Sequence, residues 1–362
     1  MFVLVDSMKL FTVGPVACYP EVLEAMAGQM YSHRSEEYLE LHFDTVERLK
    51  AFIGTGDPIF LFSSTGTGFM EAAARNCVRE KLLVCVNGSF GRRFADVAEA
   101  NGKGVVVLEP PLGEPISEEA LDGALDDDPA IEAVAITHNE TSAGLINPLE
   151  ALAEVVKEHG SMLFVDAVSS MGGTEIRVDD WGIDICFSSS QKCFGVPPGL
   201  GIGSVSERAL EASAGAVDKG WYFDLKLWER YHSQGRGTPM TSAMPQVAGL
   251  NAALKMIDGH GGRGWYFDAF RRRNERIRGG VEDLGLSIFP KKGYESPTVS
   301  CINAPEAGGP AVYGAMRGEG FELAQGYGAL KERTFRIGNM GYIEDDDIDL
   351  MLEALGRVLG KF

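Results

Sequence analysis

Two ionisable residues at the ends of expected strands have the type and the placement for chemistry. Lys192 lies in the segment ICFSSSQKCFGVPPG, residues 185–199, after an apolar run and three serines. A lysine placed there can lose its hydration, which lowers its pKa and frees the amine as a nucleophile for a Schiff base. Asp166 ends the apolar run MLFVD, residues 162–166, and a buried carboxylate requires a cation or hydrogen bonds to offset its burial. Because one strand–helix step separates the two residues, both can face the same crevice.

A third segment, SSTGTGFMEAA at residues 63–73, predicts an anion-binding turn. Thr65, Gly66 and Thr67 come where a strand would turn into a helix, so unpaired N–H groups and the helix dipole attract an anion there. The plain structural alternative is a capped helix after a tight turn. The segment lacks the lysine of the G-x-x-x-x-G-K-[ST] pattern, so it is no nucleotide P-loop. GLGIG at residues 199–203 lacks the spacing of a dinucleotide fingerprint, and we interpret its glycines as flexibility in a strand.

These three features suit one cofactor, pyridoxal phosphate (PLP). Its phosphate must be held, its pyridine nitrogen must stay protonated against a carboxylate, and its aldehyde must join a lysine. The turn at 65–67, Asp166 and Lys192 supply groups of these three kinds. The sequence therefore predicts chemistry at the Cα atom of an amino compound.

Short apolar runs alternate with amphipathic segments between residues 55 and 205. This pattern is typical of a mainly parallel sheet covered by helices on both faces. In such a sheet ligands bind beyond the carboxyl ends of the strands, where the three features lie. We expect strands at 59–62, 83–86, 105–108, 133–137, 163–165 and 183–188, and helices at 68–80, after 91, at 118–125 and at 148–159.

The chain beyond residue 260 has a different pattern, typical of an α+β domain of roughly a hundred residues. Expected strands there are 286–289, 299–303 and 334–337, and expected helices are 265–283, 311–319 and 345–359. The segment 221–245, rich in Gly, Thr and Pro, predicts no element. We expect an N-terminal segment that joins the smaller domain on the substrate side (1–20), a large cofactor-binding domain (21–255) and a C-terminal small domain (256–362).

The composition excludes several classes of function. Of 362 residues, 45% are hydrophobic and 23% are charged, as in globular proteins that bury a core. The net charge of −19 repels phosphate backbones, so nucleic acid is not an expected partner. The six cysteines form no C-x-x-C pair, so we expect free thiols, no bound metal and no disulfide framework.

The sequence predicts no membrane-spanning segment and no secretion signal. No apolar run approaches the ~18 residues of a membrane span. The opening MFVLVDSMKLF has neither the basic leader nor the long apolar core of a secretion signal. We therefore expect a cytoplasmic protein.

An ordered set of motifs resembles the class V aminotransferases of the fold-type I PLP enzymes. TVGPV at 12–16, THNETSAGLINPLE at 137–150, LFVDAVSSMGG at 163–173, SSSQKC at 188–193 and FRIGNMG at 335–341 follow the family's order and spacing over nearly the whole chain. Within that class the chain looks most similar to the alanine/serine–glyoxylate and 2-aminoethylphosphonate–pyruvate aminotransferases. The resemblance implies a large α/β domain on a mainly parallel seven-stranded sheet, plus a smaller α+β C-terminal domain.

The resemblance also implies roles for single residues. Lys192 is the Schiff-base lysine and moves the proton at Cα, and Asp166 pairs with the pyridine nitrogen. Arg336 matches the arginine that binds the substrate carboxylate, and Gly14, in TVGPV, lies on the substrate side. Further cofactor contacts are implied for Phe90, which stacks on the ring, for Thr65, Gly66, Thr67 and Gln191 at the phosphate, for Thr141 on the hydroxyl side and for Val168 under the ring.

The family forms homodimers with active sites at the interface. The partner subunit supplies phosphate contacts from the segment that matches GRGTPMTSAMPQ, residues 235–246. Here Ala243 and Met244 stand where many relatives carry a threonine. We assign the contact to Thr241, with Thr238 as the alternative.

We expect a PLP-dependent aminotransferase that uses a ping-pong mechanism. It would move the amino group of a small L-amino acid (alanine, serine or aspartate) to a small 2-oxo acid (glyoxylate or pyruvate). Transfer from 2-aminoethylphosphonate to pyruvate is an alternative. A second anionic group on the donor would need a second cation, for which His33, Arg34 and Arg236 are candidates.

Two further alternatives change the reaction or remove it. A cysteine desulfurase-like lyase would need a histidine before the lysine, a stacking histidine and a mobile reactive cysteine. The chain has Gln191 and Phe90 in the first two places, and Cys193 lies inside the turn. A non-catalytic binding protein could dispense with the lysine, the aspartate or the arginine, but all three are present.

Overall fold

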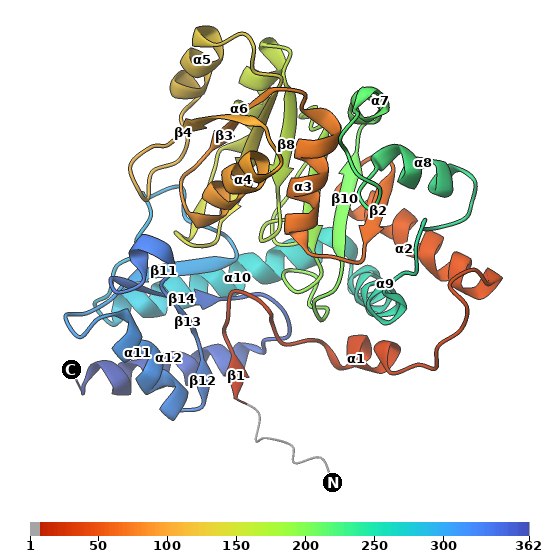
Figure 1. Ribbon diagram of the computed structural model, residues 1–362. Coiled ribbons are helices and arrows are strands. Elements are labelled where there is room, and N and C mark those ends of the chain that lie inside the picture. The colour runs from red at the N-terminus through yellow and green to blue at the C-terminus, as the bar shows by residue number, and fades with distance from the viewer. Residues whose placement is uncertain (1–7, 362) are drawn as a thin grey trace.

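A seven-stranded sheet forms the centre of the computed structural model, which describes residues 8–361 (Figure 1). The strands are β2 (Ile59–Phe62), β3 (Lys81–Cys85), β4 (Gly104–Leu108), β5 (Ala133–Thr137), β8 (Met162–Asp166), β9 (Ile185–Ser189) and β10 (Gly201–Val205). They lie in the order β2-β10-β9-β8-β5-β3-β4. β10 is antiparallel to both of its neighbours, and the other adjacent strands pair in parallel. The expected mainly parallel seven-stranded sheet is confirmed.

Helices cover both faces of this sheet because alternate side chains of its apolar strands enter two separate cores. In β2, Ile59 and Leu61 belong to one core and Phe60 and Phe62 to the other. The first core takes side chains from α2 (Glu36–Ile53), α5 (Glu118–Asp127), α6 (Leu149–Glu158) and α9 (Met244–Gly259). The second core is covered by α3 (Gly66–Cys77), α4 (Ser89–Ala100), α7 (Glu207–Gly215) and α8 (Leu225–Ser233), the last from a segment that predicted no element.

The glycines of β10 make room for an aromatic ring of α3. A Cβ at Gly203 would lie 2.4 Å from the ring of Phe69, and a Cβ at Gly201 would lie 2.9 Å from the carbonyl oxygen of Thr65. Phe69 is fully buried and stacks on Phe62 with 4.1 Å between ring centroids. Our interpretation of these glycines as flexibility is therefore wrong, since the close approach of α3 to the strand requires them.

A smaller antiparallel sheet lies at the lower left of Figure 1. It consists of β11 (Val299–Asn303), β14 (Thr334–Gly338) and β13 (Ala324–Gln325), beside α10 (Gly262–Asp283), α11 (Gly309–Gly318) and α12 (Asp345–Leu359). The strand expected at 286–289 is absent: Ile288 makes a single bridge to Ile302 of β11. The N–H of Phe289 donates to the carbonyl oxygen of Cys301 beside this bridge, but the next N–H on the same side, that of Lys291, donates to the carbonyl oxygen of Gly113, so the pairing with β11 ends there.

The start of the described chain joins this smaller part. β1 (Lys9–Leu10) pairs in parallel with β12 (Phe321–Glu322), and α1 (Pro20–Met26) follows it and packs on α9. Residues 1–7 of the expected N-terminal segment, and with them most of the opening apolar stretch, lie outside the described residues. Helix α10 links the two parts, because its first half contributes to the large core and its second half to the small one. The domain boundaries at 20 and 255 stay predictions.

Among residues 8–361, none of the helices combines the length and the apolar character that a bilayer span demands. The same residues contain no group of three His, Cys, Asp or Glu side chains arranged to bind a metal ion.

Candidate functional site

A cavity of about 250 Å³ lies at the carboxyl ends of β2, β8 and β9, next to the first turns of α3 and α4. Its lining residues are Thr65, Gly66, Thr67, Met70, Phe90, Arg93, Asp166, Val168, Ser189, Gln191 and Lys192. The structure thus brings together the predicted lysine, the predicted carboxylate and the 65–67 turn, which lie at or just after the carboxyl ends of three different strands. Of the other predicted residues, Gly14, Thr141, Thr241 and Arg336 are not part of this lining.

Lys192 stands in the turn after β9 with only 7% of its surface exposed. Its Nζ donates a hydrogen bond to the carbonyl oxygen of Val13 at 2.5 Å. Burial, followed by the nearby positive charge of Arg336, lowers the pKa of Lys192 to about 8. Gly14 is required beside it, because its φ is +106° and a Cβ there would lie 2.5 Å from Lys192 Cδ. A substantial fraction of this amine is therefore unprotonated near neutral pH, as nucleophilic attack requires.

Asp166 ends β8 inside the protein, and its Oδ1 accepts a hydrogen bond from the N–H of Val168 at 2.9 Å. Burial raises the pKa of Asp166 to about 7, the charge of Glu140 raises it further, and the charge of Lys192 opposes the shift. A cation placed against this carboxylate would reverse the shift and hold the carboxylate ionised. The site therefore favours a ligand with a positively charged group at this point.

The raised pKa of Asp166 makes a prediction for the stability of the cofactor-free protein. Between about pH 4 and pH 7 the folded state keeps a proton that the unfolded state releases, so the free energy of unfolding falls as the pH rises. The decrease is about 1.4 kcal/mol for each pH unit in this range. We expect Asp166→Asn to lack this contribution, which urea denaturation of both proteins at pH 5 and pH 7 would measure. An identical pH dependence in the two proteins would contradict the burial of a protonated Asp166.

The turn at 65–67 presents unpaired backbone donors to the cavity. Thr65 is the N-cap of α3 and has an extended conformation, and its side chain makes no capping hydrogen bond. The first N–H groups of a helix have no acceptor within the helix, and its dipole favours an anion. Gln191 lies in the same lining, and its Oε1 accepts a hydrogen bond from Ser189 at 2.7 Å, which orients the side-chain amide. These groups can bind an anion such as a phosphate.

Gly66 is required by its contact with Val168, which gives a prediction for stability. A Cβ at Gly66 would lie 2.3 Å from Val168 Cγ2. We expect Gly66→Ala to lower the free energy of unfolding by about 1–3 kcal/mol, as overpacking of a close-packed region does. Adding Val168→Ala removes the colliding methyl and should restore part of the loss, measured by urea denaturation. Gly123→Ala, in α5 with open space at its Cβ, is the matched control and should not destabilise. A Gly66→Ala protein as stable as the wild type would contradict the close contact between Gly66 and Val168.

Phe90 is held by a buried carboxylate that the sequence analysis missed. Glu140 accepts hydrogen bonds from the backbone N–H groups of Phe90 and Gly91 at 3.0 and 3.1 Å. Its other oxygen accepts from the backbone N–H and the hydroxyl of Ser142. Burial raises the pKa of Glu140, and these four donors oppose that shift because each of them favours the ionised carboxylate. Glu140 therefore fixes the first turn of α4, and with it the Phe90 ring at the cavity.

Arg336, on β14, is a buried cation without a carboxylate partner among residues 8–361. Its Nε and Nη2 donate to the carbonyl oxygen of Gln325 at 3.0 and 2.8 Å, and its Nη1 donates to the carbonyl oxygen of Thr141 at 3.0 Å. A guanidinium has five N–H groups, so two remain for a ligand. Its Cζ lies 5.7 Å from the ring centroid of Tyr327, which adds a cation–π contact. This arrangement is that of a receptor for an anion.

Two of the predicted residues, Thr141 and Thr241, lie outside the lining of the cavity. The hydroxyl of Thr141 shares a 2.7 Å hydrogen bond with Ser169, while its carbonyl oxygen positions Arg336. Thr241 is exposed, in a segment that the N–H of Ala243 ties to Ser63 by a 3.0 Å hydrogen bond. The contacts expected for Thr141 with a cofactor and for Thr241 with a partner's phosphate stay predictions.

The second cation near the cavity is Arg93, not one of the three that we considered. Arg34 donates to the carbonyl oxygens of Arg236, Thr238 and Pro239, and the cavity lining includes neither it nor His33 nor Arg236. Arg93 does line the cavity, with its Cζ 4.9 Å from the ring centroid of Phe90. Its position three residues after Phe90 on one helix is the sequence signal that would have revealed it.

The cysteine next to the lysine is not placed for chemistry. Cys193 is fully buried, and its Sγ donates to the carbonyl oxygen of Ser169 at 3.5 Å. Burial raises the pKa of the Cys193 thiol to about 12. A buried thiol of this kind is inert, because the thiolate is the reactive form. This speaks against a lyase that uses Cys193 as its mobile nucleophile.

Comparison with known proteins assigns the chain to a family. The model of the aminotransferase class-V family matches residues 17–269. An uncharacterized aminotransferase of Methanocaldococcus jannaschii is 35% identical over 97% of this chain and 95% of its own length. The serine–glyoxylate aminotransferase of Methylorubrum extorquens is 32% identical over 97% of this chain and 89% of its own. The crystal structure of an alanine–glyoxylate aminotransferase from Nostoc sp. superposes on this chain with a TM-score of 0.94 and 32% sequence identity. The superposition covers 99% of this chain and 97% of the Nostoc chain. The chain therefore belongs to the class-V aminotransferases and is a PLP-dependent transaminase of fold type I.

Proposed function

We propose that this transaminase moves the amino group of a small L-amino acid, such as alanine, serine or aspartate, to a small 2-oxo acid, glyoxylate or pyruvate. The observation that carries the proposal is Arg336, a buried guanidinium that binds carbonyl groups and keeps two N–H groups for a carboxylate. A planar guanidinium binds a carboxylate with two parallel hydrogen bonds, and both substrates carry a carboxylate. The names of the similar serine–glyoxylate and alanine–glyoxylate enzymes support the choice of substrates.

We infer that the cavity at the carboxyl ends of the strands holds PLP, because its groups fit the parts of that molecule. Thr65, Gly66, Thr67 and Gln191 would hold the phosphate, Asp166 the pyridine nitrogen and Lys192 the aldehyde carbon. Phe90 and Val168 would enclose the ring. The fit rests on the buried carboxylate that needs a cation and on the free N–H groups at the start of α3. PLP, when bound, supplies an aldehyde that takes up an amine and a ring that withdraws electrons from the adjacent Cα.

Three residues of the chain have separate roles in the proposed reaction. Arg336 binds the carboxylate of the donor and fixes its Cα relative to Lys192. Because its pKa is about 8, Lys192 can take a proton from Cα through Nζ and give one back in the second half of the reaction. Asp166, once ionised, keeps a proton on the ring nitrogen. The same arginine serves both substrates in turn, which supports a ping-pong order.

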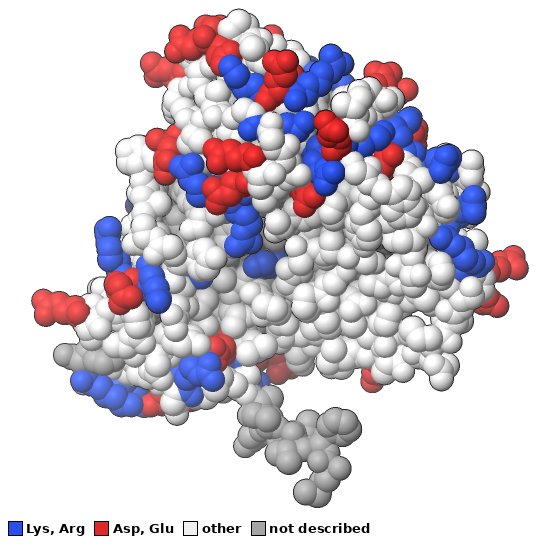
Figure 2. Space-filling view, in the orientation of Figure 1, with Lys and Arg blue, Asp and Glu red and all other residues white. Residues whose placement is uncertain are grey.

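We further propose that the protein is a homodimer with its active sites at the interface. The side chains of Leu23, Met30 and Tyr31, on and after α1, are 51%, 50% and 44% exposed. Few charged residues lie at the lower right of the space-filling view, where Figure 1 has α1 and α9 (Figure 2). Sedimentation of the purified protein tests this proposal, and a monomeric mass would contradict it.

The expected cytoplasmic location stays a prediction that cell fractionation would test.

The absorption spectrum of the purified protein tests the proposed function. We would incubate the protein with PLP, add alanine, serine or aspartate singly, and then add glyoxylate or pyruvate. The band of the lysine-bound cofactor should give way to that of the amine form with a true donor, and return when the 2-oxo acid is added. A protein without a chromophore after incubation would refute the PLP site, and a spectrum unchanged by any donor would refute the proposed substrates.

A second candidate donor is 2-aminoethylphosphonate, with pyruvate as the acceptor. A specific observation favours it, since Arg93 adds a second guanidinium beside the cavity and a phosphonate carries up to two negative charges. The same spectral experiment decides between the donors, because 2-aminoethylphosphonate is added as a fourth compound.

A further inference from the structure

Tyr327 lies on the loop that leads into β14, just before the short 3₁₀ helix Gly328–Leu330. Two glycines allow this loop to pack closely against its surroundings. A Cβ at Gly326 would lie 2.3 Å from a carbonyl oxygen of the same loop, and a Cβ at Gly328, whose φ is +58°, would lie 2.7 Å from Ser89 Oγ of α4. The backbone of Tyr327 is thus fixed against the start of α4, although 42% of the residue is exposed.

The side chain of Tyr327 contacts three groups of the proposed active site. Its ring is nearly parallel to that of Phe90, with 6.0 Å between centroids and 11° between planes. Arg336 Cζ lies 5.7 Å from the same ring centroid, and the Tyr327 hydroxyl accepts a 3.4 Å hydrogen bond from Arg93. Tyr327 therefore stands beside the groups proposed to hold the cofactor ring and the substrate carboxylate.

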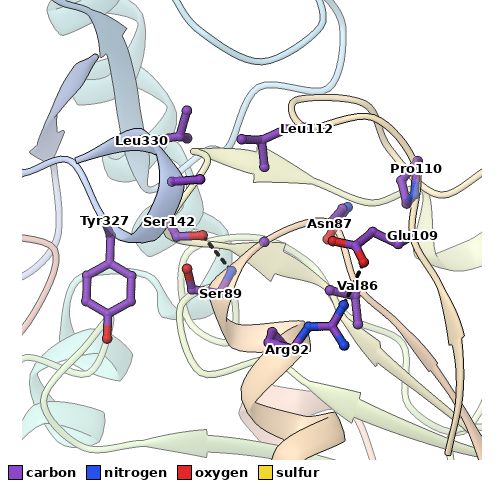
Figure 3. A pocket seen from close by; sticks show the side chains of 12 residues that line it. Val86, Asn87, Ser89, Arg92, Glu109, Pro110, Leu112, Ser142, Tyr327 and Leu330 are labelled. Carbon is purple, nitrogen blue, oxygen red and sulfur yellow. Dashed lines mark hydrogen bonds and ion pairs between the residues drawn. The ribbon is translucent and has the colours of Figure 1, made fainter. Parts of the chain in front are cut away.

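On its other side, Tyr327 lines a second cavity of about 260 Å³ (Figure 3). Figure 3 shows Tyr327 at one end of this cavity and the ion pair of Arg92 with Glu109, at 2.6 Å, at the opposite end. Much of the wall between them is apolar, formed by Val86, Pro110, Leu112, Ala329 and Leu330. Nothing in the proposed reaction uses this cavity.

We propose that Tyr327 is a specificity-determining residue. Its ring separates the substrate-binding part of the active site from this second cavity and so limits the length of the substrate side chain. The proposal rests on the proposed function, in which Arg336 holds the substrate carboxylate. A side chain that extends from a carboxylate bound there meets the ring of Tyr327 after few carbon atoms. Without the ring, the second cavity would join the active site, and its apolar wall would accept an unbranched aliphatic chain.

The affinity of unreactive carboxylic acids tests the proposal without turnover. We would measure the dissociation constants of propionate and hexanoate by calorimetry, with the PLP-loaded wild-type protein and with Tyr327→Ala. The ratio of the hexanoate constant to the propionate constant should fall by about tenfold or more in the variant, since each additional methylene in an apolar pocket is worth at least this much. In turnover, the specificity for 2-aminohexanoate relative to alanine should rise by a similar factor.

Two further variants of Tyr327 show whether its ring blocks access to the second cavity or only anchors the loop. Tyr327→Phe keeps the ring and should keep the wild-type ratio, while Tyr327→Leu shortens the side chain and should give an intermediate ratio. Tyr342→Ala removes another partly exposed tyrosine, which bonds Glu344, and should leave the ratio unchanged. If Tyr327 only anchors the loop, both acids should weaken alike and the ratio should stay constant, which would overturn the proposal.

The wild-type protein supplies an independent check. If it binds hexanoate as tightly as propionate, no closure exists and the proposal is wrong. If it binds propionate far more tightly but transfers no amino group from any donor, the proposed function fails while the closure stands. Thermal unfolding of each variant shows whether it is folded, and the two conservative variants carry the test if Tyr327→Ala is not.

Discussion

Replacing Lys192 with alanine is expected to lower kcat by about 10³-fold, because it removes the amine that joins the cofactor and moves the proton at Cα. The pKa of about 8 that burial gives Lys192 suits both tasks, which an ordinary surface lysine, with its higher pKa, would do poorly. Turnover is measured with the best donor and glyoxylate. A small added amine, such as methylamine, should restore part of the rate by supplying a base in the space that the side chain leaves.

Two control variants show that the amine itself is responsible. Lys192→Arg keeps a positive charge but offers no amine, and a guanidinium stays protonated, so this variant should be as inactive as Lys192→Ala. Lys255→Ala removes a lysine that pairs with Asp44 at the surface and should leave kcat unchanged. Near-normal turnover of Lys192→Ala would disprove the proposed role of the lysine.

Replacing Arg336 with alanine is expected to raise the KM of the amino donor and of the 2-oxo acid together, by about 10²-fold or more. Removing one partner of a buried, hydrogen-bonded charge pair costs 2–5 kcal/mol, roughly 30-fold to several thousand-fold. Both constants should rise because one guanidinium receives both carboxylates in turn. Arg336→Lys keeps the charge without the planar pair of donors and should recover only part of the loss.

A donor without a carboxylate separates binding from structural damage. A simple alkylamine does not use Arg336, so its slow reaction should proceed equally in the wild type and in Arg336→Ala. If the alkylamine reaction is lost as well, the variant has damaged the site and not only the carboxylate receptor. If the KM of the donor rises while that of the 2-oxo acid does not, the two substrates do not share this arginine.

The sequence predicted the central sheet well because its strands carry the information in their own residues. The apolar runs of β2 and β5 are short and continuous, and their expected bounds equal the observed ones, as do the bounds of β11 in the smaller sheet. The helix at 345–359 is likewise found within its expected limits, since its acidic first turn marks the start. The segment 286–289 was also expected to be a strand but makes a single bridge, since the N–H of Lys291 donates to Gly113 and not to β11, a long-range contact that the local pattern does not show.

The glycines of β10 show where local reasoning about the sequence fails. A glycine in a strand is compatible with flexibility, a bulge or the close approach of a neighbour. Only the position of Phe69, over a hundred residues earlier in the chain, reveals that close approach is the reason. The same holds for Glu140, whose four hydrogen bonds come from α4 and from its own loop.

By itself the sequence determined the class of the fold, the residue types of the site and the order in which they occur. Strand ends carry this information, because parallel strands place the turns that follow them at one edge of the sheet. The tertiary structure decided how the site is tuned and enclosed. It buries Lys192 and Asp166, gives Arg336 no carboxylate partner within residues 8–361, and brings Arg93 and Tyr327 together beside them. Desolvation and contact between distant segments are properties of packing, so no local pattern of residues encodes them.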